Sequence, residues 1–293
     1  MSNRLWTLPL VVAFLVAAAV GAHAIPSLGG PTGIVSLPNA DIAPIDELQA
    51  AVSYQAFETM AGGMAMYEGS SAANDAAVWA LQAVRGVSEE AELWAAYSRV
   101  HNSTDTDIWQ LGGKVRLEGV AGANTQVAVG GSIGRWANAF GMPWAESVGM
   151  YGDGSAPAVA DLDVLKGYIV ATQGLTPVAG WHGTASGRSV IRGSVGLFYL
   201  YADADAAGKD TLLRPFVGVE IDRGRQMVAF EWRWKDADME YKDVFSAMFR
   251  TPMGEATWLE IGTTNASPIG FGLADQDVFV RIGHHVPIAG GSY

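Results

Sequence analysis

The chain contains no cysteine among its 293 residues. A disulfide scaffold, a thiolate zinc site, an iron–sulfur cluster and a thiol nucleophile are therefore excluded. Charged residues are also scarce, at 16% of the total, whereas soluble domains average about 25%. The charges that remain give a formal net charge of −12. Because nucleic-acid phosphates would repel such a protein, we expect no nucleic-acid partner.

Apolar residues make up 49% of the chain and glycine is abundant, with 36 residues. No apolar run reaches the roughly 20 residues that a membrane-spanning helix requires. The composition is thus unusually apolar without a helical span to account for it. Strands that present apolar side chains to lipid would account for it.

The first 24 residues have the pattern of an export signal. Arg4 supplies a positive charge, residues 8–21 form a short apolar stretch, and residues 22–24 read Ala-His-Ala, which is an A-x-A cleavage site. An uncleaved N-terminal anchor is the alternative. We expect cleavage, a mature chain that begins near Ile25, and localisation in the bacterial outer membrane.

After residue 47 the sequence alternates between apolar and polar residues with the period of a β-strand. In residues 225–235, for example, Val228, Phe230 and Trp232 lie on one face, opposite the face that carries Glu231 and Arg233. We expect twelve strands, at residues 48–58, 76–87, 91–101, 107–118, 125–136, 161–173, 188–202, 212–222, 225–235, 240–250, 255–263 and 276–286.

The strand lengths and connections favour a membrane barrel. A strand of about 10 residues tilted by about 45° spans about 23 Å, close to the apolar band of about 25 Å in such barrels. The odd-numbered connections are mostly long, such as 59–75 and 137–160, and the even-numbered ones are mostly short. Long outer loops, short periplasmic turns and an even strand count are typical of outer-membrane barrels.

The predicted fold is therefore an all-β, up-and-down antiparallel transmembrane barrel of about twelve strands, spanning residues 48–293. Closure would pair every backbone polar group and remove the sheet edges. Tyr and Trp gather near the predicted strand ends, as in an interfacial girdle. The girdle candidates are Trp79, Trp94, Trp109, Tyr199, Tyr201, Trp232 and Trp234. A secreted soluble β-sandwich with these residues in its core is the alternative.

The Pro/Gly-rich segment 25–47 precedes the first strand and is expected to be either a plug in the lumen or a periplasmic lead-in. Within it, residues 29–41 read GGPTGIVSLPNAD. With the strand that follows, this resembles the opening of the YjbH-type outer-membrane proteins, with matches at Gly30, Gly33, Ile34, Val35, Pro38 and Ala40. The resemblance implies an outer-membrane barrel linked to exopolysaccharide secretion. The chain is shorter than members of that family.

The sequence offers little that indicates catalysis. No G-x-S-x-G elbow is present, and adjacent residues such as His101 and Ser103 cannot readily form a nucleophile–base pair. His284 and His285 would point to opposite faces of a strand, so they could not easily share a metal, and we expect them at the surface or rim. We predict no catalytic residue, no metal and no cofactor.

Charged residues on the predicted inner face either line a polar pore or pair with one another to fill a closed lumen. Unpaired burial would be costly, so water or partners must be present. The candidates are Lys114, Arg116, Arg192, Arg214, Glu220, Glu231, Arg233 and Arg281.

The expected function is accessory to exopolysaccharide secretion or envelope biogenesis, or that of a small porin-like channel. The alternative is a structural or adhesive barrel that acts through the loops 59–75 and 137–160. The expected partners are outer-membrane lipid and lipopolysaccharide, the barrel-assembly machinery, and polysaccharide or small polar solutes.

Overall fold

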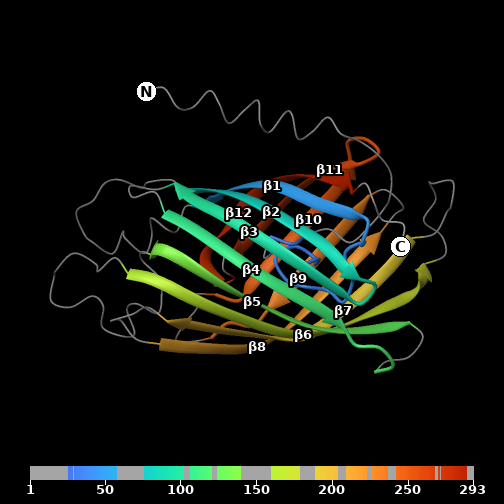
Figure 1. Ribbon diagram of the computed structural model, residues 1–293, viewed down its shortest axis with the longest axis horizontal. Coiled ribbons are helices and arrows are strands. Elements are labelled where there is room, and N and C mark those ends of the chain that lie inside the picture. Colours follow the sequence, from blue (N-terminus) through green and yellow to red (C-terminus); the bar gives the residue numbers. More distant parts are fainter. Residues whose placement is uncertain are drawn as a thin grey trace.

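The structure of the chain is a computed structural model (Figure 1). It describes residues 26–28, 30–57, 76–101, 106–120, 124–139, 160–178, 189–203, 209–222, 226–236, 242–267, 270 and 272–288. The expected signal segment, the loop 59–75 and most of the loop 137–160 lie outside these residues. No helix in the described part of the chain is long and apolar enough to cross a membrane.

Twelve antiparallel strands form one closed barrel, in which each strand pairs with its neighbours in sequence and β1 pairs with β12. The predicted all-β, up-and-down, twelve-stranded barrel is confirmed. The strands are β1 (Glu47–Phe57), β2 (Ala76–Ser88), β3 (Ala91–His101), β4 (Thr106–Arg116), β5 (Thr125–Ala139), β6 (Ala160–Val178), β7 (Ser189–Asp203), β8 (Lys209–Asp222), β9 (Met227–Arg233), β10 (Val244–Pro252), β11 (Thr257–Ala266) and β12 (Gly272–Pro287).

The barrel has two unlike ends. At one end of the barrel β1 begins and β12 finishes, and there Glu47 is paired with Pro287. We call this the termini end; β2 and β3 are joined there by residues 89–90 alone. The opposite end, which we call the loop end, lies at the left of Figure 1. Ion pairs gather at its rim, including Arg135 with Asp161 at 2.5 Å and Lys209 with Asp203 at 2.7 Å.

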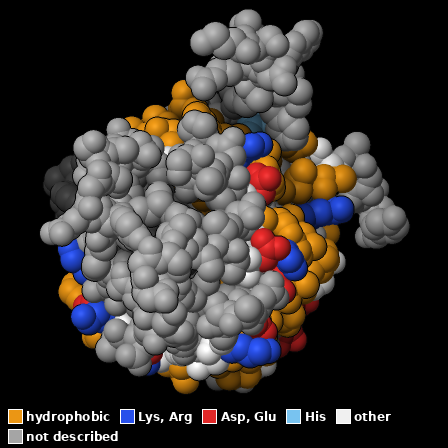
Figure 2. Space-filling view, turned by 90° about the vertical axis from the view of Figure 1, so that its left-hand side faces the viewer, with side chains coloured by type: hydrophobic (Ala, Val, Ile, Leu, Met, Phe, Trp, Pro, Cys, Tyr) orange, Lys and Arg blue, Asp and Glu red, His pale blue; other side chains and the backbone are white. Residues whose placement is uncertain are grey.

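The outer surface of the barrel is apolar along the middle of the strands. Period-two alternation turns every second side chain outward, and these are largely branched or aromatic residues. Seen from the loop end, hydrophobic side chains edge the outline of the barrel, with charged side chains near the rim (Figure 2). Large exposed apolar residues include Leu81, Leu93, Leu111, Ile133, Val195, Leu213 and Val278.

The hydrophobic core lies inside the barrel. Its largest cluster contains Trp136, Leu162, Phe198 and Phe216 together with Leu37 from the segment before β1. Large inward side chains lie opposite glycines: a Cβ at Gly112 would be 2.5 Å from Trp94 Cε2. The absence of a side chain at such positions creates the space that the neighbouring ring fills.

Val195→Arg tests whether the exposed apolar face meets lipid. Val195, in β7, is 59% exposed. In a bilayer we expect the free energy of unfolding to fall by about 2–4 kcal/mol, because arginine is poorly solvated in hydrocarbon near the midplane. Unfolding by denaturant in lipid vesicles measures this. The control is Val120→Arg, since Val120 is 63% exposed outside the strands. Equal, small effects of both substitutions would show that the outer face meets water.

Candidate functional site in the barrel lumen

Residues 26–28 and 30–46, which we call the inner segment, precede β1. The segment lies within the barrel (Figure 1) up to Ala43, and Ile45 and Asp46 are exposed where it joins β1. The segment folds on itself through two short bridges, Pro26 with Thr32 and Gly33 with Pro38. The amide of Ile34 donates to the carbonyl oxygen of Leu37 at 2.9 Å. Four further backbone bonds lie within the segment, such as that from the N–H of Leu28 to the carbonyl oxygen of Val35 at 2.6 Å, but the N–H groups of Val35 and Leu37 take their acceptor from the wall of the barrel.

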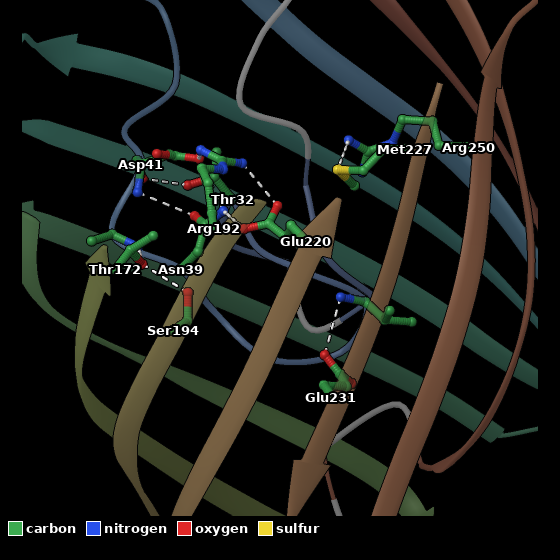
Figure 3. A network of polar contacts seen from close by, with 12 residues as sticks. Thr32, Asn39, Asp41, Thr172, Arg192, Ser194, Glu220, Met227, Glu231 and Arg250 are labelled. Atoms are coloured by element: carbon green, nitrogen blue, oxygen red, sulfur yellow. Dashed lines mark hydrogen bonds and ion pairs between the residues drawn. The ribbon is translucent and has the colours of Figure 1, made fainter. Parts of the chain in front are cut away.

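Glu231 of β9 is the wall residue that accepts the most bonds from the inner segment. Its carboxylate accepts the backbone N–H groups of Val35 at 3.1 Å, Ser36 at 2.9 Å and Leu37 at 3.1 Å. The Ser36 hydroxyl donates to it as well. Three successive N–H groups that converge on one anion form a backbone nest, and the charge strengthens each bond. The tip of the inner segment is thereby fixed to β9 (Figure 3).

A second contact joins the inner segment to β3 and β4. Glu92 accepts the N–H groups of Thr32 at 2.9 Å and Ala43 at 2.8 Å. Lys114 forms an ion pair with Glu92 at 3.1 Å and donates to the carbonyl oxygens of Thr32 at 3.0 Å and Asn39 at 3.2 Å. Both charged side chains are fully buried. The pair therefore satisfies backbone donors and acceptors of the segment at once.

A third contact joins the inner segment to β7 and β8. Arg192 bridges Asp41 of the segment at 2.6 Å and Glu220 of β8 at 2.8 Å (Figure 3). The side-chain amide of Asn39 donates to the carboxylate of the same Glu220 at 3.4 Å. Nearby, the N–H of Ala40 donates to the hydroxyl oxygen of Thr172 at 2.9 Å. Together the three contacts tie the segment to opposite walls of the barrel.

Apolar contacts fill the space between these polar ones. Ile34 and Val35 pack in a cluster with Met248 and Phe279. A Cβ at Gly218 would be 2.1 Å from Ile34 Cδ1. The side chain of Ile34 therefore occupies the space beside a wall glycine. The inner segment is closely packed as well as hydrogen-bonded.

Six of the eight charged residues predicted from the sequence lie in the lumen, in three different settings. Lys114, Arg192, Glu220 and Glu231 contact the inner segment. Arg281 is fully buried and paired with Glu260, which also pairs with Arg250 at 2.5 Å. Arg233 is buried with its guanidinium 4.7 Å from the centre of the Phe198 ring.

The remaining two candidates lie near the ends of the barrel. Arg116 donates to the carbonyl oxygen of Glu89 at 2.8 Å, at the termini end. Arg214 pairs with Asp236 and donates to the carbonyl oxygen of Lys235 at 2.9 Å, at the loop end. Neither residue is joined to the inner segment by these contacts.

Wall charges that the sequence analysis did not select include Glu92, Lys166 and Glu260. Each occupies an inward position of its strand, so the alternation of inward and outward side chains along the strand could have identified them. Glu92 is followed by the residues Leu-Trp-Ala-Ala, where small apolar residues on both faces hide the alternation. Asp41 was missed for another reason, because no strand pattern orients a residue of an irregular segment.

The structure corrects the assignment of Trp94 to the aromatic girdle. Trp94 is 5% exposed and points inward from β3, on the same face as Glu92 and Ala96. Its ring packs where Gly30 and Gly112 lack side chains. The residue lies near a strand end, as predicted, but it belongs to the inward-facing set of alternate residues in β3, which places its side chain in the lumen.

The other girdle candidates lie on the outer surface toward the loop end. Trp79, Trp109, Trp232 and Trp234 are exposed, while Tyr199 and Tyr201 are half-buried. Tyr54 contacts Trp79 with ring centres 4.7 Å apart, and Phe245 contacts Trp232 at 6.2 Å. These contacts extend the aromatic band to residues that the sequence analysis did not select.

The paired histidines are buried, although we expected them at the surface or rim. His284 shares a hydrogen bond with the Thr257 hydroxyl at 2.8 Å, and His285 lies 3.2 Å from Glu47. The ring of His285 also contacts Trp258, with centroids 4.7 Å apart. Among the described residues, no group of three or more His, Asp or Glu could hold a metal ion. His101 ends β3, and residues 102 and 103 lie outside the described ranges.

Glu231→Ala should loosen the inner segment, because three backbone N–H groups and a hydroxyl would lose their acceptor. The reporter is Ala40→Cys, a buried position in a chain without other cysteines. We expect a membrane-impermeant maleimide to label this cysteine at least ten times faster when Glu231 is also replaced. Glu255→Ala, at the exposed turn between β10 and β11, is the matched control. An unchanged labelling rate in the Glu231 variant would show that the hydrogen bonds to Glu231 do not keep the inner segment in place.

Lys114→Met should destabilise the barrel, because the Glu92 carboxylate would remain buried with its counter-charge removed. Loss of one partner of a buried pair costs about 3–5 kcal/mol. Adding Glu92→Gln should restore part of that loss, with a coupling energy of about 1–3 kcal/mol. Denaturant unfolding of the two single variants and the double variant measures this. Strictly additive effects would show that the two side chains are energetically independent.

No family model matches the chain, and no curated protein matches it. Among solved structures, it is similar to the KdgM porin in complex with disordered oligogalacturonate, with a TM-score of 0.48, 7% identity and coverage of 80% of this chain and 98% of that one. Outer membrane phospholipase A from Escherichia coli gives a TM-score of 0.43, 12% identity and coverage of 82% and 90%. Omp33 from Acinetobacter baumannii gives 0.39, 9%, and 82% and 99%. These likenesses concern the fold and carry no argument about what this chain binds.

Proposed function

We propose that the protein is a porin-like barrel of the bacterial outer membrane, closed at rest by its inner segment. The barrel presents apolar side chains outward along its strands, whereas a water-soluble barrel would present polar ones. Closure leaves no sheet edge to meet lipid. On this basis we also propose contact with outer-membrane lipid and lipopolysaccharide, and insertion by the barrel-assembly machinery.

The single observation that carries the channel proposal is the polarity of the surface beneath the inner segment. Glu92, Lys114, Glu220 and Glu231 are at most 2% exposed and all contact the segment. Buried ion pairs are seldom the most stable way to fill a core, because apolar residues of similar volume do it as well or better. A lumen filled permanently by apolar side chains of the wall would not require these charges.

A lumen that opens does require them. When the inner segment leaves, its wall partners are exposed to water, which solvates carboxylates and ammonium groups at little cost. An apolar wall would instead resist wetting and hold the segment in place. The charges then become the lining of a polar pore, where selectivity depends on charge and diameter. Small polar solutes are the proposed cargo.

A role in exopolysaccharide secretion is the second candidate. It rests on the resemblance of residues 29–41 to the opening of the YjbH-type proteins. Residues that carry the resemblance also contact the wall of the barrel: Ile34 lies against Gly218, and the N–H of Ala40 binds Thr172. This supports a shared structural role for the motif. Loss of secreted polysaccharide on deletion of the gene, with restoration by the intact gene, tests the physiological role.

Deletion of residues 26–41 tests the channel. We expect the variant to remain a barrel that resists unheated SDS, because the strands close through their own hydrogen bonds. In planar bilayers its mean conductance should exceed that of the intact chain by at least tenfold, since the wall charges would then face water. Heat-dependent mobility in electrophoresis serves as the folding control. A folded variant that conducts no more than the intact protein would contradict the channel and favour a structural or adhesive role.

A further inference from the structure

Two arginines and one glutamate form a single row across three strands of the barrel wall. Arg250 of β10 is paired in register with Glu260 of β11, and Glu260 is paired with Arg281 of β12. The three side chains are turned into the lumen and are at most 13% exposed. The carboxylate of Glu260 accepts from Nε of Arg250 at 2.5 Å and from Nε of Arg281 at 2.5 Å. One carboxylate therefore lies between two guanidinium groups, and the row has an excess of positive charge.

Both arginines have hydrogen-bond donors that the described residues do not use. Nη2 of Arg250 and Nη1 of Arg281 are buried and have no hydrogen-bond partner among those residues. The indole N–H of Trp258 has none there either. Trp258 is the next inward residue of β11 toward the termini end, and it is paired in register with Gly283, two residues from Arg281. Since a buried donor without an acceptor destabilises a fold, three of them close together favour an acceptor that the wall does not supply.

A purely structural ion pair would require only one of the two arginines. Glu92 and Lys114, on the opposite side of the lumen wall, form such a one-to-one pair, and the two charges cancel. In the row on β10 to β12, the second guanidinium adds a charge that Glu260 alone does not neutralise. Because an uncompensated charge in a poorly solvated interior is costly, the row is better suited to binding an anion than to filling a core.

The inner segment lies against this row. Apolar residues of its tip pack with Met248 and Phe279, which are the inward residues next to Arg250 and Arg281 on the loop-end side of each strand. Met227 belongs to the same cluster, and its sulfur atom lies 3.7 Å from Nη1 of Arg250 (Figure 3). When the segment leaves the lumen, the row therefore borders the open pore.

We propose that Arg250 and Arg281 form a binding site for the phosphate or carboxylate group of a solute that enters the open barrel. The inference rests on the proposed channel, and it narrows the cargo to small anionic solutes. Guanidinium groups bind such oxyanions through strong, charge-assisted N–H···O bonds in a fixed geometry. Nη2 of Arg250 and Nη1 of Arg281 are the donors, and Glu260 fixes the two guanidinium groups through their Nε atoms.

The experiment uses the full chain with Ala40→Cys, the buried reporter in the inner segment. In detergent, a cationic thiol reagent labels this cysteine when the segment leaves the lumen, and the reagent does not compete for an anion site. A bulky sulfonate buffer anion is replaced by inorganic phosphate, and in a second series by succinate, at constant ionic strength. We expect the labelling rate to rise about threefold and to saturate, because a ligand that binds only the open barrel raises its population. Comparison of the two series shows whether phosphate or carboxylate groups bind better.

Arg281→Met should abolish the rise in labelling rate, because one guanidinium remains and Glu260 neutralises it. This variant keeps Arg250 and Glu260 as a one-to-one pair, so it is expected to fold. Arg99→Met is the matched control, because Arg99 lies on the outer face of β3 with its side chain 52% exposed. The control should respond to phosphate as the chain with Arg99 does.

The outcomes separate the site from the channel on which it rests. Glu231→Ala in the same reporter chain shows whether the inner segment can leave the lumen at all. If that variant is labelled faster but phosphate and succinate have no effect, or act equally on Arg281→Met, the anion site is overturned and the channel stands. If Glu231→Ala leaves the cysteine unreactive too, the segment does not leave the lumen, and the channel and the site are both overturned.

Discussion

The closed lumen depends on the hydrogen bonds that the Glu231 carboxylate accepts from three successive backbone N–H groups of the inner segment. An irregular segment cannot satisfy its own backbone, and inside a barrel it has little access to water. It can be buried only if the wall supplies acceptors and donors at matching places. Glu231 does so for residues 35–37, and Glu92 with Lys114 does so for Thr32, Asn39 and Ala43. The charges of the wall are thus the complement of the segment's backbone.

This complementarity explains why the interior contains both signs of charge and yet little open polar surface. Each wall charge near the inner segment is matched by a segment group or by a second wall charge, as in the Arg250–Glu260–Arg281 set. The same set of side chains can therefore support two states, one packed around the segment and one solvated by water.

The strands of the barrel could be predicted from the sequence because a strand's alternation is local. The predicted strand at residues 91–101 coincides with β3, and the segment predicted at 276–286 lies within β12. Parity also identified inward charges such as Lys114 and Arg281. Trp94 was assigned to the aromatic girdle because it lies near a strand end and not from the alternation of side chains, and that assignment was wrong. The extent of β6 was underestimated, since its residues 174–178 carry no clear alternation.

The position of the inner segment could not be predicted in this way. Its Pro and Gly content indicates irregular backbone but does not specify a partner. The residue that binds Val35 lies 196 positions away in sequence, on a strand whose charge could equally have lined a pore or paired across the wall. Only the three-dimensional arrangement decides which of these applies, because the partner of a buried carboxylate is set by barrel closure and not by neighbouring residues.

The most direct test of the account is a disulfide between the inner segment and the wall in the double variant Ile34→Cys, Gly218→Cys. These positions are in contact, and the chain has no other cysteine. In lipid, mild oxidation should form the bridge in nearly all molecules, hold conductance at its lowest level, and release it on reduction. If both cysteines instead remain unbridged and react freely with a membrane-impermeant maleimide, the inner segment does not occupy the lumen and the account fails.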